Sequence, residues 1–512
     1  MKKESDLFAL IHSLTGHEKR YFKIYASKHV MGEKNNYLKL FDFLCKQKEY
    51  EEEDVLDYFK KEKFVKHLFA VKYYLYNLIL KSILDFHSQS SIDIRLNEML
   101  GSTELLYNKA LYKQCSKLLQ KAKELAVSNE KDLHLLAISE LERKIMHREI
   151  TDIVKSEKQL ESIQMEREKA LHRYSNFLAY LFYSDTLYFK RRQMPLNREL
   201  SRIKDIDALA KKSLLRREGK ALSLQAKIEF NHFHFMYYQS QDDVVKMQNH
   251  VKRNIELYRS RPDIIKDRPF GYLIQLYHYC LCCFRLQKYN ETFPIFEEIK
   301  SLNPRKWPFL DAYIRTDINL LELTAYTNTG EFRKATETAK KTNENLIRFS
   351  GKIGRDHEVM FYYRIAYAYF GNNEYGEALK WVNNLLNMSK TDLREDLQGF
   401  ARILNLIIHY EIGNVDLLEY QIRSTYRFLR KKNKLYQFET IILNATRKLP
   451  PGNRSKELIL FFDNLRKKLV PLLKDPQEKN AFEYIDIISW LESKIKKRSF
   501  AEIVKEKVLR LN

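Results

Sequence analysis

The sequence predicts an all-α protein, and three observations support this prediction. The 512 residues include only 13 glycines and 10 prolines, well below the usual shares of about 7% and about 5%. The first proline is Pro195, so the N-terminal third of the chain contains very few helix breakers. Apolar residues recur at helical spacing, and no Asn-Gly or Asp-Gly dipeptide indicates a β-hairpin.

Residues 1–90 are predicted to form a compact helical module. Thr15 and Glu18 have capping-box spacing and precede apolar residues at helical intervals. Residues 38–44 suggest a second helix, and the acidic residues 51–54 suit the start of another. Residues 67–86 predict one long, largely buried helix, and the polar residues that follow predict a linker.

The next segment, residues 94–265, is predicted to be a degenerate helical-repeat region. Its apolar residues keep the period of an α-helix almost throughout. Helices are expected near residues 94–108, 112–128, 131–149, 151–192, 200–213, 218–239 and 242–259.

Residues 266–449 contain a spaced pattern that repeats four times. In each repeat an apolar helix leads to a short polar turn, then to an aromatic or aliphatic residue and a second amphipathic helix. The residues that end the turns are 40 to 43 positions apart, and they are Tyr289, Phe332, Tyr375 and Val415. A single repeat cannot bury its apolar face alone, so the repeats are expected to stack.

These segments resemble the tetratricopeptide repeat. The matching residues are Tyr326, Gly330, Phe332 and Ala335 in one repeat and Ala366, Tyr369, Tyr375 and Ala378 in the next. The spacing exceeds the family's usual period of about 34 and approaches the ~40–47 of HEAT and armadillo repeats. The resemblance implies a right-handed α-solenoid of antiparallel helix pairs with long repeats. Pro294 lies early in a second helix, which must therefore start late or bend.

The resemblance also implies a concave groove lined by the first helix of each repeat. The residues at the groove-facing places are mostly aromatic: Tyr277, Phe284, Arg285, Asp317, Asn328, Tyr363, Tyr367, Phe370 and Tyr410. Family members that clamp a peptide carboxylate need polar or cationic residues where Tyr277, Leu320 and Tyr363 stand, so that clamp is not expected. The groove would suit an amphipathic helix of a partner or the protein's own terminal helices. Half of these aromatic residues could instead belong to the core.

The C-terminal residues 453–512 follow Pro450-Pro451-Gly452 and are predicted to cap the array. Amphipathic helices are expected over residues 457–473, 477–494 and 500–511. A stack of repeats leaves its last apolar face open, and such helices can cover it.

The net charge of +23 raises the alternative of a polyanionic partner. The basic residues are dispersed, and each cluster is expected to be a solvated helix face. Together they could follow a phosphate backbone. The residues in question are Arg191, Arg192, Arg216, Arg217, Arg430, Lys431, Lys432, Lys467 and Lys468.

No pattern in the sequence predicts catalysis, a cofactor or a metal site. Cys280, Cys282 and Cys283 lie together but have no CxxC partner, so core packing is expected. His232 and His234 are two residues apart, which places them on different sides of a helix. Neither a Gly-rich phosphate loop nor an HExxH motif occurs.

Five cysteines and the lack of a long apolar run favour a reducing cytoplasm and no membrane span. The leading prediction is a non-enzymatic scaffold or adaptor that binds a helical or extended segment of another protein in the aromatic groove. The alternative is a nucleic-acid- or ribosome-associated protein, with a regulator as one variant, that binds through its basic faces. Strong salt dependence of binding would favour the alternative.

Overall fold

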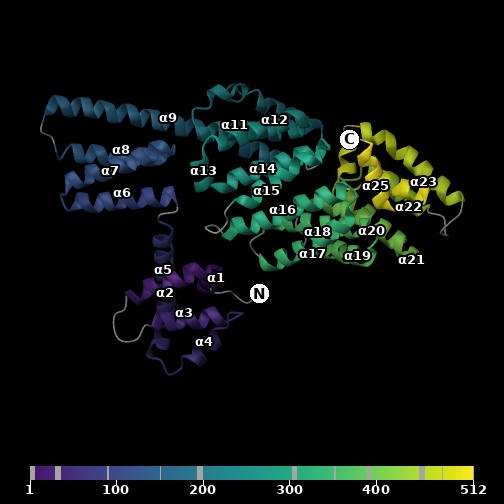
Figure 1. Ribbon diagram of the computed structural model, residues 1–512, viewed down its shortest axis with the longest axis horizontal. Helices are drawn as coiled ribbons and strands as arrows, with labels where there is room; N and C mark the ends of the chain where they lie inside the picture. Colours follow the sequence, from purple (N-terminus) through teal and green to yellow (C-terminus); the bar gives the residue numbers. More distant parts are fainter. Residues whose placement is uncertain are drawn as a thin grey trace. The chain divides into compact units, whose positions relative to one another are not determined.

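The computed structural model describes residues 6–28, 36–88, 91–149, 152–192, 200–302, 308–350, 353–388, 394–448, 456–475 and 477–510. Every regular element within these ranges is helical, so the predicted all-α class is confirmed (Figure 1). The chain divides into two compact units, Met1–Tyr174 and Ser175–Asn512. The division falls within the long helix α9 (Ile153–Arg192), and the four-part domain scheme stays a prediction.

The N-terminal part of the first unit contains five helices around one apolar core. The predicted capping box forms, because the Thr15 N–H donates to Glu18 Oε2 (2.7 Å) and the Glu18 N–H donates to Thr15 Oγ1 (3.3 Å). Glu18 also contacts His87 (Nε2–Oε1 2.8 Å), which joins the second helix to the fifth. The five helices are α1 (Asp6–Ser13), α2 (Gly16–Lys28), α3 (Asn36–Lys46), α4 (Glu52–Tyr58) and α5 (Leu68–His87).

Helix α5 is not largely buried, and on this point the sequence prediction is wrong. One face, which includes Leu75 and Ile79, lies in the core. Phe69, Tyr73 and Leu84 are 86%, 67% and 59% exposed. The apolar sequence runs around the whole helix, but the shorter helices of the module cover only one side of it.

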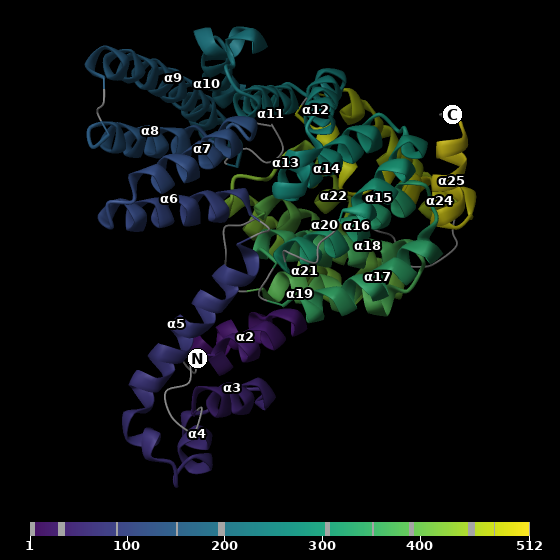
Figure 2. The ribbon, with the colours of Figure 1, turned by 60° about the vertical axis from the view of Figure 1, so that its left-hand side comes forward.

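The rest of the first unit is built from α6 (Ile92–Asn108), α7 (Tyr112–Ser128), α8 (Asp132–Met146) and the start of α9. Figure 2 shows α6, α7 and α8 side by side. Small residues such as Cys115 and Ala122 are fully buried and allow the close approach of these helices. The expected boundaries of all these helices are confirmed to within a few residues.

The second unit continues with many packed helices. Neighbouring helices contact each other. In the series α12, α14, α16, α18, α20 and α22, each helix also contacts the member that follows it. The helices are α10 (Leu200–Ala210), α11 (Leu224–Ser240), α12 (Val244–Arg259), α13 (Pro262–Asp267), α14 (Pro269–Arg285), α15 (Thr292–Ser301), α16 (Pro308–Asn328), α17 (Phe332–Arg348), α18 (Arg355–Gly371), α19 (Tyr375–Asn387), α20 (Glu395–Ile412), α21 (Val415–Lys431), α22 (Gln437–Arg447), α23 (Lys456–Leu469), α24 (Ile487–Lys496) and α25 (Phe500–Leu509).

One helix-ending turn recurs through this unit. A residue with positive φ ends each first helix, and the next N–H bonds to the carbonyl five residues earlier, as in a Schellman motif. The next α-helix begins two residues after the positive-φ residue, except after Gln287, where a 3-10 turn comes first. The positive-φ residues are Asp242, Gln287, Gly330, Asn373 and Gly413. The same turn also ends α6 at Ala110 and α7 at Glu130 in the first unit, so among the described residues it is not confined to residues 266–449.

Inside the repeats, small residues allow close helix packing as expected. Ala335 and Ala378 are fully buried. A Cβ on Gly371 would lie 2.1 Å from the ring of Phe332, so only glycine fits there. Helix α15 starts late, after a 3-10 turn over residues 289–291, which confirms the expected effect of Pro294.

The C-terminal segment differs from the prediction of one helix over residues 477–494. A 3-10 turn covers Lys479–Glu483, residues 484–486 are not helical, and α24 begins only at Ile487. The helix is interrupted because backbone groups at residues 484 and 486 bond to tyrosine hydroxyls of α18 instead of to other backbone groups of a helix.

Candidate functional site

The structure brings most of the predicted groove residues together on α14, α16, α18 and α20. Tyr363, Tyr367, Phe370 and Phe284 are buried, at no more than 6% exposure. Tyr277, Arg285, Asn328 and Tyr410 are partly buried. The side chain of Asp317 lies outside the residues that the structure describes.

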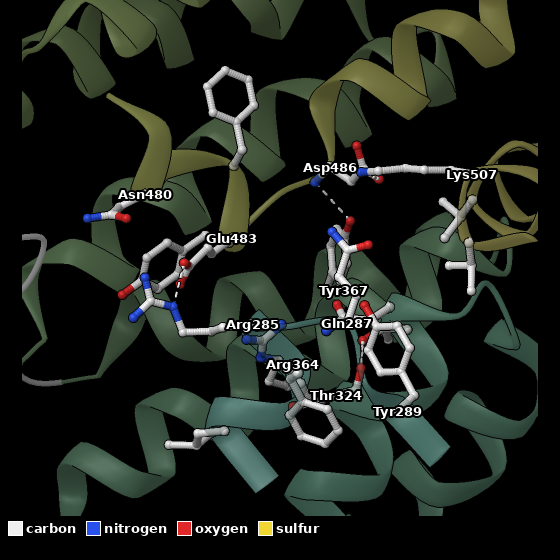
Figure 3. Close-up of a pocket in the computed structure, with 18 of the residues that line it drawn as sticks. Arg285, Gln287, Tyr289, Thr324, Arg364, Tyr367, Asn480, Glu483, Asp486 and Lys507 are labelled. Carbon is white, nitrogen blue, oxygen red and sulfur yellow. Dashed lines mark hydrogen bonds and ion pairs between the residues drawn. The ribbon is translucent and has the colours of Figure 1, made fainter. Parts of the chain in front are cut away.

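The chain's own C-terminal segment covers the buried tyrosines. The Tyr363 hydroxyl donates to the carbonyl oxygen of Tyr484 (3.1 Å), and the Asp486 N–H donates to the hydroxyl of Tyr367 (3.1 Å). Burial raises the pKa of both hydroxyls on α18, so they stay protonated and able to donate. Figure 3 shows Tyr367 directed at Asp486 and Arg285 directed at Glu483.

Further contacts extend along this segment. The Tyr484 ring stacks on Phe400 at 4.6 Å between centroids, and its hydroxyl donates to Asp396 Oδ2 (2.9 Å). The indole N–H of Trp490 donates to Glu411 (2.6 Å). Tyr410 packs against the same indole, with centroids 6.0 Å apart.

Helix α25 completes the cover. The Phe500 ring lies 5.2 Å from Phe332 and 5.7 Å from Phe370. Gly330 has a φ of +75°, and a Cβ there would lie 2.7 Å from the backbone oxygen of Ala501. The sequence suggested two occupants for the groove, a helix of a partner or the protein's own terminal helices. In the structure, the protein's own terminal helices cover this face.

A cavity of about 370 Å³ remains between this segment and the helices beneath it. Its wall contains far more polar and charged groups than the aromatic groove predicted from the sequence. The residues most relevant to its chemistry are Arg191, Gln239, Arg285, Gln287, Thr324, Asn328, Arg364, Tyr367, Asn480, Glu483, Asp486 and Lys507. Helices α11, α14, α16 and α18 supply one side, and the C-terminal segment supplies the other.

Two of the cavity's four cations are paired. Arg285 bonds to Glu483 (Nε–Oε1 2.9 Å) and to Asp242. Lys507 bonds to Asp486 (Nζ–Oδ2 2.9 Å). These contacts engage both acidic residues of the cavity wall.

The other two cations, Arg191 and Arg364, make no hydrogen bond or ion pair with any residue that the structure describes. Arg191 lies at the end of α9 and was predicted to belong to a solvated basic face. That prediction is wrong, because its Nε atom is buried without a partner in the wall of the cavity. Helix α9 packs against α11, where Ser184 Oγ donates to the carbonyl oxygen of Glu229 (3.3 Å), and the Arg191 side chain at its end is half-buried.

Two histidines, His232 and His278, interact electrostatically with the Arg191 guanidinium. Burial lowers the pKa of Arg191 to about 10, and the positive charge of Arg285 adds to the effect. Burial likewise lowers the pKa of His232 to about 4 and that of His278 to about 3, with the charge of Arg191 contributing to both. The two imidazoles stack with centroids 5.9 Å apart and are neutral at pH 7.

The remaining predicted basic residues do not gather into one described site. Lys432 pairs with Glu395 (2.7 Å), and Lys467 pairs with Asp463 (2.8 Å). The side chain of Arg192 lies outside the described residues. The exposed members of the set are Arg216, Arg217, Arg430, Lys431, Lys467 and Lys468.

The cysteines and histidines behave as core residues, as expected from the sequence. Cys280, Cys282 and Cys283 are fully buried, and burial raises the pKa of the latter two thiols to about 12 and about 11. His234 contacts the carbonyl oxygen of Leu215 (Nε2–O 2.8 Å). Within the described ranges, no group of histidine, cysteine and acidic residues could hold a metal ion.

The comparisons with known proteins add no family. No protein-family model matches the sequence, and no curated protein matches it. In the part of the chain that the structure describes, no helix combines the length and apolarity needed to cross a membrane.

Sequence reasoning missed Arg364, Glu483 and Asp486 as site residues. One signal was present: Arg364 is the single charged residue in the run from Val359 to Phe370. A lone cation in an apolar helix indicates either a buried pair or a binding site. The two acidic residues had no comparable signal, because their partners lie on distant helices.

Proposed function

We propose that this chain is a tetratricopeptide-like, right-handed α-solenoid of antiparallel helix pairs and acts as a non-enzymatic adaptor. In this proposal it binds a segment of another protein in the cavity between the inner face of α14, α16 and α18 and the chain's own C-terminal segment. The recurring Schellman turn and the contacts between alternate helices support the repeat architecture.

The observation that best supports polypeptide binding is the way this face holds residues 483–486 of the same chain. Two tyrosine hydroxyls bond to backbone groups, and Arg285 bonds to the side chain of Glu483. Hydroxyl contacts to main-chain groups hold any extended segment, whereas the arginine selects an acidic side chain. The adjacent cavity has space for further side chains of a partner.

Site-specific photocrosslinking in the native host tests this proposal. A photoreactive amino acid at position 328 would face the cavity, because Asn328 lines it. The same amino acid at position 333 is the matched control, since the Arg333 side chain is 90% exposed on the neighbouring helix α17. The expected result is an intermolecular crosslink to a protein at position 328 alone, and nuclease treatment should leave it unchanged.

Two outcomes would contradict the proposal. Crosslinks from position 328 that reach only residues 480–508 of the same chain would mean that the C-terminal segment is the sole occupant. Crosslinked species that disappear after nuclease treatment would instead favour the nucleic-acid alternative.

A further inference from the structure

Among the residues that the structure describes, the wall of the cavity has more cations than acidic residues. Its cations are Arg191, Arg285, Arg364 and Lys507, and its acidic residues are Glu483 and Asp486. Arg285 and Lys507 already engage both acids. The excess therefore resides on Arg191 and Arg364.

Arg364 lies on α18 beside the two tyrosines that hold the C-terminal segment. Its side chain is partly buried, and it has no hydrogen-bond or ion-pair partner within the described ranges. A guanidinium has five donors in a planar fork that matches the two oxygens of a carboxylate. A partly buried arginine in a polar cavity is therefore available for an anionic ligand.

The surroundings of Arg191 lead to the same conclusion. Its Nε atom is buried and has no hydrogen-bond partner among the described residues, and it interacts electrostatically with Arg285, His232 and His278. Both imidazoles are neutral at pH 7, and Arg285 adds positive charge. No described residue supplies a counter-ion to Arg191. A buried charge in that state is unfavourable, and an anion in the cavity would remove that cost.

The ligand class follows from what the same face already holds. The bound segment from Phe482 to Asp486 carries two carboxylates: that of Glu483 pairs with Arg285 of α14, and that of Asp486 pairs with Lys507 of α25. We infer that the cavity takes an acidic segment of the partner protein, whose carboxylates pair with Arg191 and Arg364. This inference rests on the proposed function and specifies the chemistry of the partner.

Selection from a random peptide library on the full-length protein tests the inference. Peptides rich in Asp and Glu are expected to be enriched. In fluorescence anisotropy, a selected peptide should bind the R191Q/R364Q double variant about tenfold more weakly or worse. The exposed-site variant R333Q is the matched control and should bind like the wild type. Affinity should fall as salt is added.

Thermal unfolding without peptide separates a binding role from a structural one. Replacement of Arg191 by Gln removes an unpaired buried charge, so the variant should melt at the same temperature as the wild type or higher. A lower melting temperature would show that Arg191 stabilises the fold, and it would overturn the assignment of this residue to a ligand.

Other results would also overturn the inference. One is enrichment of peptides without acidic residues, and another is equal binding of acidic peptides to R191Q/R364Q. Competition by inorganic phosphate or citrate as strong as that of the peptide would identify a small anion as the ligand. A crosslinked partner at position 328 that persists in R191Q/R364Q would refute the acidic segment and leave the adaptor function standing.

Discussion

Replacement of Phe500 by Ala should detach the C-terminal segment from the face that it covers. The Phe500 side chain is 5% exposed and packs against Phe332, Phe370 and Tyr367 at centroid distances of 5.2, 5.7 and 6.4 Å. Truncation of a buried phenylalanine to alanine costs about 3–5 kcal/mol, because the transfer term and the cavity term add. We expect a loss of this size in the free energy of unfolding.

Thermal unfolding and hydrogen exchange measure the effect. For a unit that spans Ser175–Asn512, the entropy of unfolding is about 0.7 kcal/mol/K, so Tm should fall by about 4–7 °C. The Asp486 amide, which donates to Tyr367, should exchange faster.

Leu509→Ala on the same helix is the matched control. Leu509 is 78% exposed, and its truncation should change the free energy of unfolding by less than about 0.5 kcal/mol. Equal effects of the two substitutions, or unchanged exchange at Asp486, would refute the docking of α25 described above.

Three further predictions concern turns and titration. Gly330→Ala should lower Tm, since its Cβ would clash with the backbone of α25, whereas Gly376→Ala meets nothing within 4 Å and should leave Tm unchanged or raise it. Gln287→Gly should stabilise by about 1 kcal/mol in urea unfolding, because the native φ is +59°; an equal gain from Gln287→Ala would contradict this reason. His232 and His278 have pKa values near 4 and 3 in the folded state and about 6.5 when unfolded, so the unfolded chain binds more protons between these values. Stability should therefore fall as pH drops from about 6.5 to about 4, and a pH series of melts should show a shallower fall for His278→Gln.

Much of the fold could be predicted from the sequence because its signals are local. The scarcity of glycine and proline and the 3.6-residue period located most helices of residues 94–259 to within a few residues. The start of α11 is an exception, at Leu224 rather than near 218. Ser223 caps that helix by accepting from the Ala226 N–H (3.1 Å), a local bond that the period does not reveal.

The covering of the site could not be predicted, because it depends on contacts between distant residues. Tyr363 and Tyr484 are 121 positions apart, and neither side chain indicates the other as its partner. Apolar patterning also does not show whether a face is covered. Helix α5 is apolar on all sides yet exposes Phe69, whereas α18 is apolar on all sides and is buried. The two helices differ in exposure because the fold places packed helices around α18 but only on one side of α5.

The two kinds of contact on the inner face divide the work of recognition in the proposed adaptor. Tyr363 and Tyr367 bond to backbone groups of the chain's own C-terminal segment, so they hold that segment without preference for its side chains. Preference must then come from side-chain contacts, and the charged groups of the cavity are arginines and a lysine with too few acids. Arg285 already makes a side-chain contact of this kind, because it pairs with the carboxylate of Glu483. An acidic partner segment would extend the same chemistry to Arg191 and Arg364, whereas a basic segment would meet four cations and be rejected.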